Sequence, residues 1–354
     1  MYTSEYIIVG QGLAGTAIAQ QLHQRNKTFK IIDILDPNQA SRIASGIWNP
    51  VVLKRMKKVW LADEMLHALP NFYNQSEHLF GVNLGSDLKV HRLFSDTEEA
   101  NNWIGYSDDN NFNELLYPEI QHSKNGFVND KNGLGLVKAS GRIDTEKWLS
   151  AARKWFKSHD LLLESHFDHL KLKVSDASIT YGEITAKAII FCEGMYASIQ
   201  NPFFKWLPFA LTKGEVLLIE SKELDLNKII NSGVFILPLG NHLYKVGATY
   251  AWNTLDKIPT EKAKEELIFK LKKFISAPFK IIEQQAGIRP TIQDRRPLLG
   301  SHPIHKNIHI FNGMGSRGIL MAPYLSQIFV DHLIDSTPLP QDADIKRFKK
   351  YFAN

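Results

Sequence analysis

The fold is decided near the start of the chain by the stretch Tyr6-Ile7-Ile8-Val9-Gly10-Gln11-Gly12-Leu13-Ala14-Gly15. Its apolar, β-branched run predicts a buried strand, and apolar residues at helical spacing after the glycines predict a helix that ends near Asn26. Phe29-Lys30-Ile31-Ile32-Asp33 predicts a second strand. The order strand, glycine-rich turn, helix and strand is that of a βαβ unit, which opens a Rossmann-like domain.

Each residue of this turn has a physical role in binding a dinucleotide. Gly10 permits the tight turn, Gly12 lets a pyrophosphate approach the backbone, and Gly15 lets helix and strand pack closely. The helix that begins at Leu13 and Ala14 offers free N–H groups and a positive dipole end to the phosphates. Asp33, 18 residues after Gly15, is expected to hold a ribose hydroxyl pair. These residues alone leave FAD and NAD as alternatives.

Composition excludes several other classes of protein. The 354 residues include 42 Lys plus Arg against 37 Asp plus Glu, a formal net charge of +5, and one cysteine. An ordinary apolar content excludes disorder, a single cysteine excludes a disulfide scaffold, and no apolar run approaches the roughly 18 residues of a membrane span. One thiol without a secretory signal favours the cytoplasm. The paired histidines at 166 and 169 and at 302 and 305 lack further ligands, so no metal site is expected.

The rest of the chain predicts a second kind of sheet between parts of the first domain. Segments 213–219, 234–237 and 243–247, the last two joined through Gly240-Asn241, predict an antiparallel sheet. Segments 188–192 and 308–311 predict further buried strands of the first domain. We therefore expect an α/β protein, α+β overall. The predicted dinucleotide-binding domain is discontinuous, over 1–80, 141–205 and 285–354, and the substrate (cap) domain covers 81–140 and 206–284.

Two further segments favour a flavin over a nicotinamide. In Ala40-Ser41-Arg42-Ile43-Ala44-Ser45-Gly46-Ile47-Trp48-Asn49-Pro50, small residues allow close approach of a long cofactor, and Trp48 is placed to cover a ring. A second glycine-rich turn, Gly313-Met314-Gly315-Ser316-Arg317-Gly318, precedes a helix predicted over 319–334. The positive end of that helix would stabilise negative charge on a reduced isoalloxazine. A nicotinamide dehydrogenase would leave this second turn unexplained.

Taken in order, these motifs resemble the D-amino-acid oxidase family of FAD-dependent oxidoreductases, especially its glycine oxidase-like members. The resemblance extends through Gly141-Arg142-Ile143-Asp144, Phe191-Cys192-Glu193-Gly194, Val246-Gly247-Ala248-Thr249 and Arg289-Pro290. The runs Gly46-x-x-x-Pro50 and Gly315-Ser316-Arg317-Gly318 are also similar to the flavin-bearing C-terminal half of the bifunctional tRNA wobble-uridine modification protein. We expect no counterpart of that protein's methyltransferase half within these 354 residues.

The resemblance implies FAD as the cofactor and a carboxylated amine as the substrate. Arg289 matches the family position that binds the substrate carboxylate, and Arg317 and Tyr250 are further candidates for the active site. In glycine oxidase-like members the second substrate arginine stands one position earlier, at Ser316. Together the turns and the resemblance predict the FAD-binding residues as Gly10, Gly12, Leu13, Ala14, Gly15, Asp33, Ser41, Arg42, Gly46, Ile47, Trp48, Gly194, Met314, Gly315, Ser316, Arg317, Gly318 and Ile319. Tyr244 and Trp252 are additional candidates for lining the pocket.

The implied reaction is oxidation of a C–N bond of a small amine or amino acid, by hydride transfer from carbon to flavin N5. We expect the FAD to be non-covalent, because no attachment residue of the family type is present and Cys192 ends a buried strand. Two alternatives stay open. One is a flavoenzyme acting on a carboxymethylaminomethyl-type uridine of tRNA, for which Lys54-Arg55-Met56-Lys57-Lys58 would meet the RNA backbone. The other is a flavin-binding protein without turnover.

Overall fold

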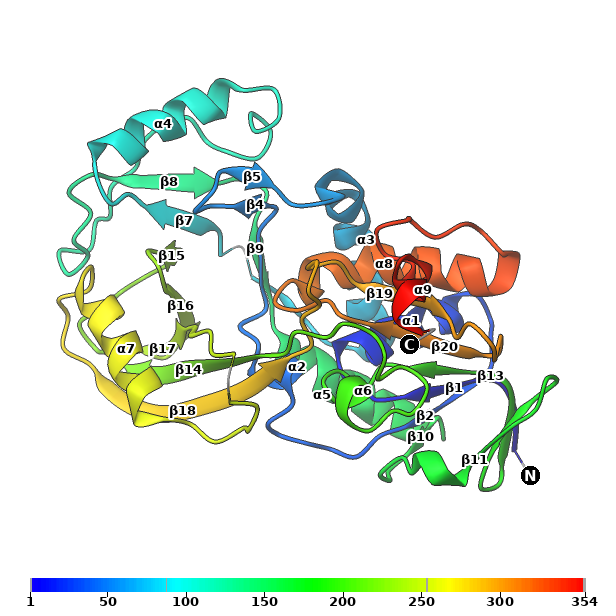
Figure 1. Cartoon of the computed structure of the whole chain (residues 1–354). Helices are drawn as coiled ribbons and strands as arrows, with labels where there is room; N and C mark the ends of the chain where they lie inside the picture. The colour runs from blue at the N-terminus through cyan, green and yellow to red at the C-terminus, as the bar shows by residue number, and fades with distance from the viewer. Residues whose placement is uncertain (1, 87, 253, 353–354) are drawn as a thin grey trace.

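The protein has two lobes that lie side by side in a computed structural model, which describes residues 2–86, 88–252 and 254–352 (Figure 1). Both ends of the chain lie in the same lobe, where blue and orange segments are neighbours (Figure 1). The other lobe is built from the middle of the chain. Within the described ranges, no helix is long and apolar enough to cross a membrane.

The lobe that holds the termini contains an eight-stranded mixed sheet. Its parallel core consists of β10 (Leu162–Leu163), β2 (Phe29–Ile32), β1 (Tyr2–Val9), β13 (Ile184–Phe191) and β20 (Ile308–Asn312). The antiparallel strands β12 (Ile179–Tyr181), β11 (Leu172–Val174) and β19 (Leu298–Ser301) complete it. The apolar run at the end of β1 is buried on both faces, as is typical of parallel strands.

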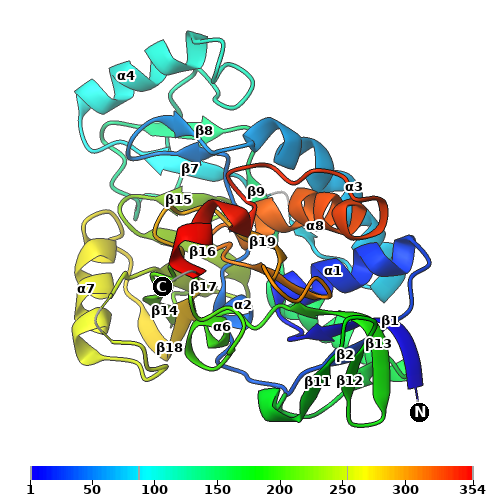
Figure 2. The same ribbon diagram turned by 45° about the vertical axis from the view of Figure 1, so that its right-hand side comes forward.

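Helices from both ends of the chain cover one face of this sheet. α1 (Leu13–Gln24), α3 (Ala62–Phe80), α5 (Thr145–Ser158) and α8 (Gly318–Asp335) share a single apolar cluster with β1. In two views α1 lies beside α8, so the first and last helices are neighbours in space (Figures 1 and 2). A separate cluster on the other face includes Ile7, Val9, Phe204, Leu207 and Phe348.

The start of α8 is fixed by a hydrogen bond that replaces one lost to a proline. Pro323 lies inside the helix and has no N–H to donate to the carbonyl of Ile319, four residues earlier. The hydroxyl of Tyr73, from α3, donates to that carbonyl at 2.9 Å instead. Tyr73 is buried, so this bond satisfies two polar groups that water cannot reach. It ties the glycine-rich turn before α8 to the neighbouring helix.

The second lobe is a seven-stranded sheet in the order β18-β14-β17-β16-β15-β7-β8. All neighbouring strands are antiparallel except β15 and β7, which are parallel. α7 (Glu261–Lys272) and α4 (Thr97–Asp108) cover it. The strand bounds are β7 (Val90–Leu93), β8 (Leu134–Val137), β14 (Thr212–Glu220), β15 (Ile229–Asn231), β16 (Phe235–Gly240), β17 (Leu243–Gly247) and β18 (Lys280–Arg289).

Short elements connect the lobes. β3 (Ile47–Trp48), β9 (Gly141–Ile143) and β6 (Gly85–Ser86) form a three-stranded sheet, and β4 (Val51–Val52) with β5 (Lys57–Lys58) forms a hairpin. The remaining elements are α2 (Ala40–Ile43), α6 (Tyr196–Ile199), α9 (Lys349–Phe352) and the 3-10 turns His169–Lys171 and Ile345–Phe348.

The predicted fold class and hairpin are confirmed, but the turn of the hairpin lies one residue further along. β16 includes Gly240, and the two turn residues are Asn241 and His242, with φ of 51° and 60°. Positive φ at both positions is the type I′ geometry that matches the twist of the flanking strands. Asn tolerates this conformation well, and here His adopts it too.

Candidate functional site

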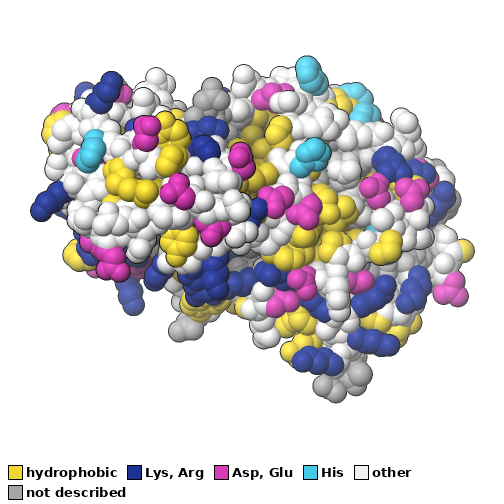
Figure 3. All heavy atoms as spheres, turned by 90° about the horizontal axis from the view of Figure 1, so that it is seen from above, with side chains coloured by type: hydrophobic (Ala, Val, Ile, Leu, Met, Phe, Trp, Pro, Cys, Tyr) yellow, Lys and Arg dark blue, Asp and Glu magenta, His cyan; other side chains and the backbone are white. Residues whose placement is uncertain are grey.

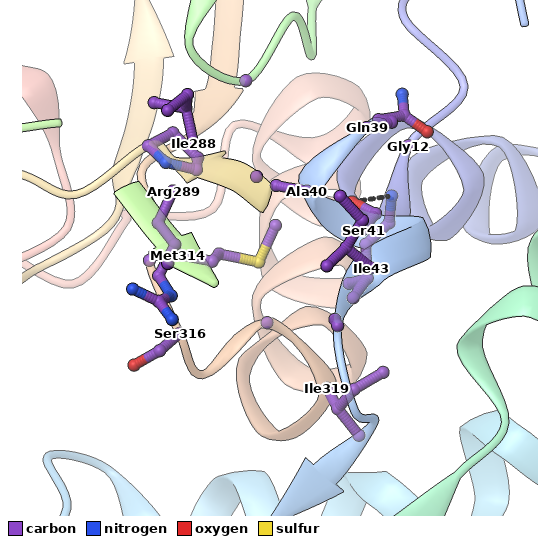
Figure 4. Close-up of a pocket in the computed structure, with 18 of the residues that line it drawn as sticks. Gly12, Gln39, Ala40, Ser41, Ile43, Ile288, Arg289, Met314, Ser316 and Ile319 are labelled. Atoms are coloured by element: carbon purple, nitrogen blue, oxygen red, sulfur yellow. Dashed lines mark hydrogen bonds between the residues drawn. The ribbon is translucent and has the colours of Figure 1, made fainter. Parts of the chain in front are cut away.

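Both glycine-rich turns line one cavity of about 1080 Å³, which also receives residues from the second sheet. This volume lies at the upper end of the range for small-molecule and cofactor sites. Arg289, Met314 and Ser316 lie on one side of the cavity, and Gly12, Gln39 and Ser41 on the other (Figure 4). The two sides belong to opposite ends of the chain, so the site exists only in the folded molecule.

The turn before α1 has the geometry of a phosphate cradle. Gly10 has a φ of +97°, and a Cβ on Gly15 would lie 1.8 Å from the carbonyl oxygen of Gly10, so both positions need glycine. A Cβ on Gly12 would stand only 3.2 Å from the side chains of Gln39 and Ser41. The N–H of Leu13 donates to Ser41 Oγ at 3.1 Å, which places the hydroxyl at the helix N-terminus. These residues fit a pyrophosphate.

Asp33 follows β2, and its carboxylate accepts hydrogen bonds from Gln11 and Arg153, which the sequence did not predict. Its Oδ1 accepts the N–H of Gln11 at 2.9 Å, and its Oδ2 accepts Arg153 Nη1 at 2.7 Å. Burial raises the pKa of the Asp33 carboxyl above its ordinary value, while the Gln11 N–H and Arg153 act to lower it. A carboxylate has lone pairs beyond these two bonds, so Asp33 can still accept from ribose hydroxyls. Arg153 comes from α5, far along the chain.

Two of the residues predicted to bind FAD do not line the cavity. Arg42 does not line the cavity, because its Nη1 donates to Glu146 at 2.7 Å and to Ser150 at 3.0 Å on α5. Gly15 is also absent from the cavity wall, because its place is under the turn, against Gly10. Every other residue predicted to bind FAD lines the cavity.

Trp48, Met314 and Gly318 also line the cavity. Trp48 lines the wall, and a Cβ on Gly141 would lie 2.9 Å from its indole, so this glycine makes room for Trp48. Gly318 begins α8 beside α1, where an added Cβ would lie 3.1 Å from Leu13. Met314 is buried and borders the same space.

Arg289 ends β18 and extends across the neighbouring strand. A Cβ on Gly214 would lie 1.9 Å from Arg289 Nη2, so the guanidinium occupies the space that this glycine leaves. The guanidinium lies 4.3 Å from the centre of the Tyr250 ring, and Nη1 donates to the carbonyl of Thr249 at 3.2 Å. Burial lowers the pKa of Arg289, yet arginine stays cationic at any physiological pH. No ion pair joins it to an acid of the described chain.

Arg317 lies at the N-cap of α8 and also lines the cavity. Burial lowers the pKa of its guanidinium, Tyr250 acts to raise it, and Arg295 lowers it further. Among residues 2–86, 88–252 and 254–352, none forms a hydrogen bond or ion pair with the Arg317 side chain. Arg289, Arg317 and Tyr250, the three residues predicted for the active site, thus all line one cavity.

Tyr250 belongs to the loop between β17 and α7, whose described residues are anchored at three points. Lys213, 1% exposed, donates from Nζ to Asp256 Oδ1 at 2.7 Å, and Glu215 accepts the N–H of Thr260 at 2.8 Å. At its far end Lys257 pairs with Asp36 after β2. The loop thus runs from the second sheet to the dinucleotide-binding lobe. The pairing of Lys257 with Asp36 carries no local signal in the sequence.

Tyr244 and Trp252, the additional lining candidates from the sequence, are not part of the wall. Tyr244 is buried, and its hydroxyl donates to the carbonyl of Leu224, away from the large cavity. Trp252 is 54% exposed and lies outside the cavity lining. Cys192 is buried at the wall, and burial raises the pKa of its thiol well above the ordinary value. The described residues hold no group of three potential metal ligands.

Comparison with known proteins finds a matching family and relatives that cover almost the whole chain. The profile of the FAD dependent oxidoreductase family matches residues 5–332. Glycine oxidase of Bacillus subtilis is 22% identical over 358 residues, which cover 96% of this chain and 95% of that protein. The crystal structure of glycine oxidase from Geobacillus kaustophilus superposes with a TM-score of 0.79 at 18% identity, over 98% of each chain.

A further relative is a much longer protein. The tRNA 5-methylaminomethyl-2-thiouridine biosynthesis bifunctional protein MnmC of Idiomarina loihiensis is 27% identical over 167 residues. That match covers 44% of this chain and only 27% of the relative. The family match spans nearly the whole chain and includes both glycine-rich turns. The chain belongs to the family of FAD-dependent oxidoreductases.

Proposed function

We propose that the protein oxidises the C–N bond of a small carboxylated amine or amino acid. The observation that carries this proposal is Arg289, which is half-buried at the cavity wall with no acidic partner in the described chain. A half-buried cation without a counter-ion is costly, so a ligand that supplies a carboxylate is favoured there. The guanidinium fork matches a carboxylate in two parallel hydrogen bonds.

The residues of this chain then have distinct roles. FAD, when bound, supplies an acceptor for the hydride of the substrate carbon. Gly10, Gly12 and Ser41 would hold its pyrophosphate, and Asp33 its ribose. We also retain the proposals that FAD is non-covalent and that residues 1–80, 141–205 and 285–354 form its domain, with 81–140 and 206–284 as the cap. Arg289 and Tyr250 would bind and orient the amine, and such orientation supplies much of the rate in a reaction that needs no strong acid or base.

The test is an anaerobic titration of the purified holoenzyme with glycine, sarcosine, D-amino acids, proline analogues and modified uridines. We expect at least one carboxylated amine to bleach the visible flavin band. Arg289→Gln should lower the affinity for that amine by about 10- to 100-fold, because a hydrogen bond to a charged group is lost. A flavin that no amine bleaches would show binding without turnover, and a colourless protein that takes up no FAD would contradict the proposal altogether.

A second candidate substrate is a modified uridine within tRNA, and one observation favours it. Lys54 lies exposed at the cavity, at the tip of the hairpin formed by β4 and β5, beside Arg55 and Lys57. Against it, Lys58 is paired with Asp63, and acidic and basic side chains are interspersed over the face seen in Figure 3. Large single-sign fields are the usual footprint of nucleic-acid binding.

This candidate is separated from the first by the salt dependence of tRNA binding. If RNA is the substrate, affinity should fall steeply as salt rises, and replacing Lys54, Arg55, Lys57 and Lys58 by Gln should reduce that slope. Affinity that is indifferent to salt and to these changes would eliminate it.

A further inference from the structure

A buried polar cluster lies behind the first glycine-rich turn. Gln11 is buried, so its side chain needs partners inside the protein. Its Nε2 donates to Thr16 Oγ1 and to the carbonyl of Leu149 on α5, both at 3.1 Å, and its backbone N–H donates to Asp33 Oδ1 at 2.9 Å. α5 lies next to β10, which pairs with β2 (Figure 1). The turn, the residue after β2 and α5 therefore meet in one hydrogen-bonded cluster.

Arg153, from α5, is a buried cation at the centre of this cluster. Its Nη1 donates to Asp33 Oδ2 at 2.7 Å and to Gln11 Oε1 at 3.2 Å. Its Nη2 donates to Glu164 Oε1 at 2.9 Å, and Glu164 is also paired with Lys157. Asp33 lines the cavity, whereas Arg153 does not. Arg153 can therefore act on a bound ligand only through the residues that it holds.

Asp33 depends on this cation because its carboxylate is largely shielded from water. Its side chain is 10% exposed, and burial raises the pKa of the Asp33 carboxyl. The hydrogen bonds from Gln11 and Arg153 act to lower that pKa, with a smaller contribution from Arg42. An ionised carboxylate only accepts hydrogen bonds, so the lone pairs that Gln11 and Arg153 leave free can accept from ribose hydroxyls. A protonated carboxyl has less capacity to accept them.

We propose that Arg153 is a positioning residue for FAD: it holds the Asp33 carboxylate as an acceptor for the ribose of the cofactor, and it fixes the Gln11 side chain of the first turn against that carboxylate. This inference rests on the proposed role of Asp33 in binding FAD. Two observations carry it, namely the buried hydrogen bonds that Arg153 makes to both residues and its position behind the cavity wall.

The proposal predicts how FAD affinity depends on pH. Ribose binds the ionised Asp33, so a proton on this carboxyl competes with the cofactor. FAD affinity should then be highest above the pKa that Asp33 has in the free protein, and it should fall as the pH falls through that value. In Arg153→Gln the cation beside Asp33 is lost and burial is unopposed by it, so the fall should begin about one to three pH units higher than in wild type.

The test measures free FAD in ultrafiltrates of the diluted holoprotein between pH 8 and 5. Arg153→Gln should show the shifted fall in affinity, and Arg153→Lys, which keeps the charge, should restore most of the wild-type profile. Lys157→Gln is the matched control, because Lys157 lies on the same helix and pairs with the same Glu164 at 2.5 Å, and it should keep the wild-type profile. In an Asp33→Asn background, Arg153→Gln should cost little further affinity, because the carboxylate that it holds is gone.

Two results would overturn the inference. One is a pH profile of Arg153→Gln that coincides with wild type, or one that Lys157→Gln shifts equally far. The other is an equal loss of FAD affinity on Arg153→Gln with and without Asp33, which assigns Arg153 to the fold alone. If Arg153→Gln does not fold, Asp33→Asn and the charge-neutral double variant still give this second comparison. An Asp33→Asn protein that binds FAD as wild type does would instead refute the proposed role of Asp33, whereas amine oxidation is tested separately by flavin bleaching.

Discussion

At the scale of a single residue, Arg289 can lie where it does only because residue 214 is a glycine, which has no side chain. An alanine methyl group at 214 would lie 1.9 Å from Arg289 Nη2, so the guanidinium must move. Gly214→Ala should therefore weaken binding of a carboxylated amine by about tenfold or more, while FAD content stays at wild type. Titration of the holoenzyme with the amine, followed by flavin absorbance, measures this.

Gly105→Ala is the matched control, because nothing lies within 4 Å of a Cβ at that position in α4. Unchanged amine affinity in Gly214→Ala would show that the Arg289 guanidinium does not bind substrate from where it lies.

Some site residues could be predicted from the sequence, whereas the partners of their side chains could not. The glycines of both turns and Asp33 were predictable, because backbone conformation and strand position fix what they can do. Arg42 was predicted at the cofactor, but its rotamer is decided by Glu146 on α5, about a hundred residues later. Arg153, the partner of Asp33, is 120 residues away along the chain, and Lys257, the partner of Asp36, is 221 residues away. Such pairs depend on tertiary packing, which periodicity does not encode.

At the scale of elements, the start of α8 depends on Tyr73 as the substitute donor for Pro323. Tyr73→Phe leaves the buried Ile319 carbonyl without this bond and should lower the free energy of unfolding by about 1–3 kcal/mol. In a Pro323→Ala background the restored N–H can donate to Ile319, so the cost of Tyr73→Phe should fall by about 0.5 kcal/mol or more. Urea unfolding of the four proteins measures this cycle, and identical costs in both backgrounds would refute the account.

Most elements are predictable from the sequence, and the two exceptions have different causes. The strands at 188–192, 213–219 and 308–311 and the last helix were recognised from continuous apolar runs and bounding glycines. The parallel pairing of β15 with β7 was not predicted, because it joins segments about 140 residues apart without a local turn signal. The sequence predicts the hairpin turn at Gly240-Asn241, one residue before its actual position, because glycine is a commoner turn residue than histidine. In the structure His242 takes the left-handed conformation instead.

At the scale of the whole molecule, buried histidines predict how stability depends on pH. Burial lowers the pKa of His309 to about 3 and the pKa values of His91 and His302 to about 4. In the unfolded chain histidine titrates near 6.5, so between about pH 6.5 and 4 the unfolded state binds more protons. The free energy of unfolding should therefore fall as pH falls, by up to about 1.4 kcal/mol per pH unit for each histidine.

Urea unfolding between pH 7 and 5, where carboxylates remain largely ionised, isolates this effect. His309→Gln should flatten the pH dependence, whereas the exposed His67→Gln should keep the wild-type slope. A wild-type stability that does not change across this interval would contradict the prediction.

The arrangement of the whole molecule brings its two ends together around one cavity, and the central claim is that a single FAD spans it. A crystal structure of the purified yellow protein tests this most directly. We predict one FAD per chain, with its pyrophosphate at Gly10 to Gly15 and its ring between Trp48 and the turn at 314–318, facing Arg289. A ring bound elsewhere, or a separate ligand at each turn, would contradict the account.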